Sequence, residues 1–139
     1  MSSLRFPERS HLEAFVDAVR RDQKAFLKPY LPSCDDEWYA VVLECFEMLK
    51  MPYFNGNVAN TAAHAFYKFC KNHRFSDGNK RTAVIAKSIF LIHNGYFPIF
   101  SPDAFYQLAA SVASSESKQS EWNTEGLKFT FGWSLELLE

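Results

Sequence analysis

Apolar residues recur every three or four positions along most of this chain, which is the spacing of one face of a helix. The first stripe begins near residues 7–10 and predicts a helix that ends in the region 29–32, where two prolines interrupt the pattern. Its inner face is expected to carry five residues: Leu12, Phe15, Val16, Val19 and Phe26.

Two further helices are predicted before the middle of the chain. Residues 33–36 offer capping side chains for a second helix. Its apolar stripe consists of Val41, Val42, Cys45, Phe46 and Leu49. A third helix is expected over about residues 61–72, and it turns Ala62, Ala65, Phe66 and Phe69 inward.

The segment from Gly78 to Asn94 differs from the others because it is apolar nearly all round. A helix of that kind is buried on every side, and Gly95 is a typical helix terminator. Pro102 is well placed in the first turn of a fifth helix. We therefore predict an all-α fold, a bundle of about six helices around one central buried helix, with residues 1–139 forming a single domain.

Two segments do not fit a helix clearly. Tyr53, Phe54, Asn55 and Gly56 precede Val58, and Asn-Gly flanked by apolar residues favours a β-hairpin, although a plain loop between helices explains the segment as well. Residues 127–138 alternate like a strand but also fit a helix face. We expect a closing helix there, because no partner strand is evident.

Composition narrows the class of protein. Among 139 residues, 47% are apolar and 17% aromatic, which is enough for a real core. A net charge of −1 argues against a nucleic-acid binder, which usually has a basic excess. The chain has no apolar run long enough for a membrane span and no signal core, so a cytoplasmic protein that binds no membrane is expected.

Polar residues gather where the central helix begins. Lys80 and Arg81 lie in its first turn, where the helix dipole disfavours cations. A bound anion would relieve this conflict, since Gly78 allows close approach to the backbone and Asn79 can donate a hydrogen bond. Lys80 offers a point charge and Arg81 a planar fork suited to phosphate oxygens. The pattern indicates a polyphosphate site.

Two residues that precede this turn could take part in a reaction of the bound phosphates. Asp77 is a natural ligand for Mg²⁺, which often binds one carboxylate together with substrate phosphates. His73 can accept a proton near neutral pH. Each residue also has a plainer explanation: Asp77 as a helix cap, His73 as an ordinary loop residue, the two cations as surface charges. Together the groups favour phosphoryl or nucleotidyl transfer.

The stretch HRFSDGNKRT, residues 73–82, resembles the motif of the Fic/Doc family, whose broad form is H-x-F-x-(D/E)-G-N-x-x-R. The chain places Arg81 directly after Lys80 and so matches better the Doc toxin branch, with H-x-F-x-D-(A/G)-N-K-R. The resemblance extends from about Ala62 to Pro102. It implies the Fic-type helical bundle, with Phe75 in a structural role.

The resemblance also implies roles for individual residues. His73 would be the general base, Asp77 would hold Mg²⁺ against the phosphates of ATP, and Gly78, Asn79, Lys80 and Arg81 would bind the nucleotide, with Lys80 and Arg81 also catalytic. The hairpin of Tyr53, Phe54, Asn55 and Gly56 would be the flap that docks a target segment by strand addition.

The group that is transferred depends on one residue. Most Fic enzymes resemble AMP transferases and commonly have glycine where this chain has Lys80, whereas the Doc toxin has lysine and resembles a kinase acting on elongation factor Tu. We therefore expect phosphoryl transfer, with AMP transfer as the alternative. The family's inhibitory pattern (S/T)-x-x-x-E-(G/N) is not found, so a separate antitoxin is expected. An inactive helical adaptor is the third interpretation.

Overall fold

The computed structural model describes residues 4–25, 27–51, 58–71, 75, 78–98, 101–114 and 135–137. Helices dominate this part of the chain, and two strands of three residues pair with each other. The elements are α1 (Arg9–Arg21), the 3-10 helix η1 (Lys28–Tyr30), α2 (Asp36–Leu49), α3 (Val58–Lys71), α4 (Asn79–His93), β1 (Tyr96–Pro98), α5 (Pro102–Ser114) and β2 (Leu135–Leu137). The predicted all-α fold is confirmed.

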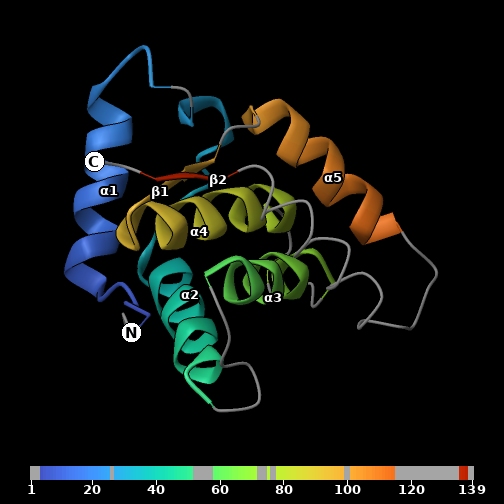
Figure 1. Cartoon of the computed structure of the whole chain (residues 1–139). Helices are drawn as coiled ribbons and strands as arrows, with labels where there is room; N and C mark the ends of the chain where they lie inside the picture. The colour runs from blue at the N-terminus through green and yellow to red at the C-terminus, as the bar shows by residue number, and fades with distance from the viewer. Residues whose placement is uncertain are drawn as a thin grey trace.

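Helix α4 occupies the middle of the bundle, as its apolar sequence predicts. Its residues 82–91 are all buried, ten in succession. Figure 1 shows α4 crossing the centre of the molecule, with α3 alongside it, α2 below and α5 on the other side. The first turn of α4, from Gly78 to Arg81, is only partly exposed.

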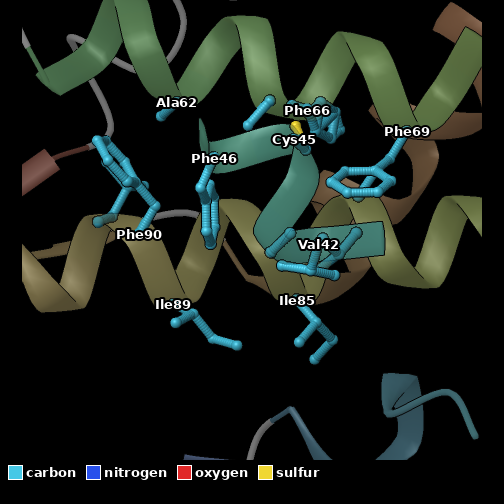
Figure 2. Packing of buried hydrophobic residues seen from close by; sticks show 14 of the residues in the cluster. Val42, Cys45, Phe46, Ala62, Phe66, Phe69, Ile85, Ile89 and Phe90 are labelled. Atoms are coloured by element: carbon cyan, nitrogen blue, oxygen red, sulfur yellow. The ribbon is translucent and has the colours of Figure 1, made fainter. Parts of the chain in front are cut away.

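The core fills the space between α2, α3 and α4. Figure 2 shows Val42, Cys45 and Phe46 of α2 lying among side chains of α3 and α4. Phe46 packs 6.0 Å from Phe90, measured between ring centroids. The predicted stripes of α2 and α3 are buried without exception. Burial of aromatic and aliphatic side chains on this scale is the main stabilising contribution to the fold.

The first helix ends earlier than expected. Helix α1 stops at Arg21, well before the prolines that were predicted to end it. Asp22 adopts an extended conformation, and its side chain accepts a hydrogen bond from the backbone N–H of Lys24 at 3.0 Å. This local bond competes with helix continuation. Of the predicted inner face, Leu12, Val16 and Val19 are buried, Phe15 is partly buried, and Phe26 lies outside the described residues.

The prediction of a closing helix at the C-terminus is wrong for residues 135–137. They form β2, which pairs antiparallel with β1 and places Leu137 opposite Tyr96 and Leu135 opposite Pro98. The partner strand has only three residues and follows directly after α4, so no alternating pattern reveals it. The predicted hairpin at Asn55 and Gly56 lies outside the described residues.

The N-terminal segment is attached to the C-terminal end of α4. The Asn94 side chain accepts a hydrogen bond from the Arg5 backbone N–H and donates one to the Arg5 carbonyl, both at 2.8 Å. Phe6 adds a ring contact with Phe90 at 5.4 Å between centroids.

Within the described part of the chain, no helix combines the length and apolar character that crossing a membrane requires.

Candidate active site

The backbone changes direction sharply at Gly78, where α4 begins. Gly78 is the N-cap residue and has φ 85° and ψ 12°, which is left-handed and favours glycine. Its carbonyl accepts the first helical hydrogen bond from the Thr82 N–H, at 2.8 Å. Because glycine has no side chain, the N-cap contributes no side-chain cap to the first turn. The turn thus presents helix-terminal N–H groups of the kind that bind anions.

The Asn79 side chain fixes the loop that leads into this turn. Its Nδ2 donates to the Phe75 carbonyl at 2.7 Å, and its Oδ1 accepts from the Phe75 N–H at 3.0 Å. Phe75 packs against the core, as predicted. The side-chain amide of Asn79 is therefore engaged with the backbone of the motif, and its predicted contact with nucleotide stays a prediction.

Two cations occupy the first turn of α4, and that turn holds no acidic residue. Lys80 and Arg81 are both partly exposed. A Cβ atom placed on Gly78 would lie 3.7 Å from Nη2 of Arg81, so the guanidinium reaches back over the N-cap. Two positive groups beside the positive end of a helix create a local field that favours a polyanion.

The end of α3 adds positive charge to the same region. Burial raises the pKa of the Cys70 thiol to about 12, and the charges of Lys80 and Lys71 oppose that rise. Both lysines therefore act electrostatically on a residue in the last turn of α3, which also carries Lys68. The thiol itself stays protonated at neutral pH, so Cys70 is not a nucleophile here.

Several predicted site residues lie outside the described residues. These are the proposed base His73, the proposed metal ligand Asp77, and the flap residues Tyr53, Phe54, Asn55 and Gly56. The structure therefore brings together Gly78, Asn79, Lys80 and Arg81, which form one turn. Within the ranges that are described, no group of three or more His, Cys, Asp or Glu side chains is arranged to hold a metal.

Two residues near the turn, Pro32 and Trp38, were not predicted from the sequence. Pro32 is buried, and its Cβ would be 3.5 Å from a Cβ on Gly78. Trp38 of α2 donates from Nε1 to the Thr82 hydroxyl, at 3.0 Å. One signal was available: Trp38 lies one turn before the apolar stripe of α2, and a buried tryptophan there needs a hydrogen-bond acceptor for its N–H. Its partner, 44 positions away, could not be read from spacing.

Comparison with protein families gives one match. The model of the Fic/DOC family covers residues 11–91, more than half of the chain. The chain belongs to the Fic/DOC family. This Fic/DOC match ends near the C-terminus of α4 and includes the whole turn from Gly78 to Arg81. Comparisons with curated proteins and with solved structures gave no match.

The match extends further toward the N-terminus than the motif resemblance did. It starts in α1 at residue 11, whereas the resemblance was expected to begin near Ala62. Helices α1, α2 and α3 are thus part of the Fic/DOC unit and not an unrelated extension. Membership of this family indicates ATP-dependent modification of proteins in general.

Proposed function

We propose that this Fic/DOC chain transfers the γ-phosphoryl group of ATP to a hydroxyl group of a target protein. The observation that carries the proposal is the first turn of α4, where Lys80 and Arg81 stand beside the left-handed Gly78 with no acidic residue in the turn. Phosphoryl transfer relies mainly on positioning and on electrostatic stabilisation of the phosphates. A turn with this charge and with helix-terminal N–H groups is suited to both.

In the proposed reaction His73 takes the proton of the target hydroxyl. The hydroxyl oxygen forms a bond to the γ-phosphorus, the bond from that phosphorus to the β,γ-bridging oxygen breaks, and ADP leaves. Arg81 and Lys80 neutralise the phosphate oxygens, and the N–H groups of the turn donate to them. Asp77 directly precedes the N-cap, and one carboxylate beside phosphate oxygens suits Mg²⁺, which would add further charge neutralisation.

Lys80 is the reason for proposing phosphoryl transfer over AMP transfer. A long cation in the first turn fills space that a glycine would leave open and adds a charge for a terminal phosphate. The same residue supports a place in the Doc branch, with a target in the translation machinery such as elongation factor Tu and an antitoxin partner. The flap of Tyr53, Phe54, Asn55 and Gly56 would dock the target segment.

A nucleotide titration tests the proposed site. The chain is expected to bind ATP in a Mg²⁺-dependent manner, and Arg81→Ala should weaken binding by about 1.5–3 kcal/mol, the usual range for hydrogen bonds to charged groups. Arg21→Ala is a matched control, since Arg21 is an exposed arginine at the C-terminal end of α1 and lies outside the proposed site. An inactive adaptor would show no Mg²⁺-dependent binding, and equal affinity of Arg81→Ala and wild type would show that the phosphates bind elsewhere.

A further inference from the structure

A buried hydrogen bond joins α2 to the start of α4. Trp38 Nε1 donates to Oγ1 of Thr82 at 3.0 Å, and the two residues are 1% and 0% exposed. A buried indole N–H without an acceptor would cost the desolvation of that donor, so the bond fixes where Thr82 sits relative to α2. Thr82 immediately follows Arg81 in the first turns of the helix.

Backbone N–H groups of the same two residues connect Thr82 to Gly78 and Trp38 to the cap of α2. The Thr82 N–H donates to the Gly78 carbonyl at 2.8 Å, which closes the first turn. On the other side, Asp35 caps α2 by accepting from the Trp38 N–H at 2.9 Å. The segment that ends at Asp35 contains Pro32, which packs against Gly78. The residues at the beginning of α2 and just before it therefore pack against the first turn of α4.

We propose that Trp38 and Thr82 are positioning residues of the active site. They hold the first turn of α4 so that Gly78 and Arg81 face the phosphates in one fixed geometry, and neither touches the nucleotide. The proposal rests on the proposed function for its activity readout. Its physical basis is that reacting and binding groups must be held within a fraction of an ångström by supporting contacts.

Helix α4 offers a control for a merely structural role. Ser88 is 1% exposed, and its hydroxyl donates to the Val84 carbonyl at 2.8 Å. It belongs to the same helix and also makes a buried hydroxyl hydrogen bond, but it lies away from the first turn. Ser88→Ala thus removes a buried hydroxyl hydrogen bond within α4 without altering the contact between α2 and α4. Thr82→Ser keeps the hydroxyl that accepts the hydrogen bond. Thr82→Val keeps the shape of the side chain but removes that acceptor.

The test compares these variants and Trp38→Phe. Thr82→Val and Trp38→Phe are each expected to weaken ATP binding about tenfold, with Thr82→Ser close to wild type and Ser88→Ala unchanged. The double variant should be no weaker than either single one, because both remove the same bond. The proposal would be overturned if ATP affinity fell in proportion to melting temperature in every variant, Ser88→Ala included.

Amide hydrogen exchange separates this inference from the proposed function. The amide of residue 82, which closes the first turn of α4 on the Gly78 carbonyl, should be less protected from exchange in Thr82→Val and Trp38→Phe than in wild type, whereas in Ser88→Ala its protection should not change. Unchanged exchange in the first two variants would refute the positioning role whatever the chain binds. If wild type binds no ATP, the proposed function fails, and the exchange data still decide whether this pair orders the turn.

Discussion

Two features of the structure favour glycine at position 78: the backbone conformation and the packing of neighbouring residues. Its φ of 85° is left-handed, which costs an L-residue with a side chain roughly 1–2 kcal/mol. Its absent side chain also leaves the N-cap open between Pro32 and Arg81. Gly95 shares the first feature, with φ 85°, but nothing lies within 4 Å of the position of its Cβ.

The two glycines therefore make a matched pair of substitutions. Gly78→Ala and Gly95→Ala should each lower the free energy of unfolding by roughly 1–2 kcal/mol, because both impose the same backbone strain. Only Gly78→Ala should also weaken ATP binding, since relief of its strain moves the turn that we propose holds the phosphates. Denaturant unfolding and nucleotide titration measure the two effects. Equal ATP affinity of both variants would contradict the placement of the site.

Lys87 is a residue whose burial no sequence pattern predicts. It is 1% exposed on α4, and its Nζ lies 3.1 Å from the ring centroid of Phe105 of α5. The ring face favours the ammonium form, while burial disfavours it. Burial dominates, and the pKa of Lys87 is lowered well below its ordinary value of 10.5. The folded chain thus holds this proton less tightly than the unfolded chain does.

This difference predicts a pH dependence of stability. Between the lowered pKa of Lys87 and 10.5, the unfolded chain binds more protons, so stability rises with pH by up to about 1.4 kcal/mol per pH unit. Lys87→Met keeps the volume and should flatten that slope. Unfolding of both proteins between pH 7 and pH 8 measures it, below the ordinary pKa of 9.0 of Cys34 and Cys70, whose raised folded pKa values oppose the trend at higher pH. Parallel slopes would mean that Lys87 keeps an ordinary pKa.

At the scale of elements, α1 meets the end of α4 through two histidines. The rings of His11 and His93 lie 4.7 Å apart between centroids. Nδ1 of His11 accepts from the Glu8 N–H at 3.0 Å, and this bond is half of the capping box that starts α1. Burial lowers the pKa of His93, with the charges of His11 and Arg5 acting in the same direction. Acid therefore weakens this contact between the two helices.

The attachment of α1 should accordingly be pH-sensitive. A histidine with a lowered pKa stabilises the fold above its ordinary value of 6.5, and that stability is lost as pH falls through the folded pKa. The melting temperature of wild type should drop more between pH 7 and pH 5 than that of His93→Gln. Melting curves at the two pH values test this. The idea is refuted if the variant loses as much as wild type does.

At the scale of the whole molecule, the sequence predicts the bundle better than its ends. The stripes of α2 and α3 and the all-round apolar α4 follow from local spacing, which one sequence records. The partner of β2 does not, because three-residue strands carry no period and their pairing depends on distant contacts. In the site, the turn from Gly78 to Arg81 can be recognised as a sequence motif, whereas Pro32 and Trp38 come close to it only through packing between helices, which spacing does not record.

For the molecule as a whole, we propose that ATP phosphates bind at the start of α4 and that the γ-phosphoryl group passes to a protein. Incubation of the chain with ATP labelled at either the α or the γ position, in a bacterial lysate, tests it most directly. His73→Ala is the matched control and should lose transfer by ~10²–10⁴-fold while keeping ATP affinity. Phosphoryl transfer predicts a protein band that carries the γ label but not the α label. A band that carries the α label instead would show AMP transfer and contradict the assignment made to Lys80.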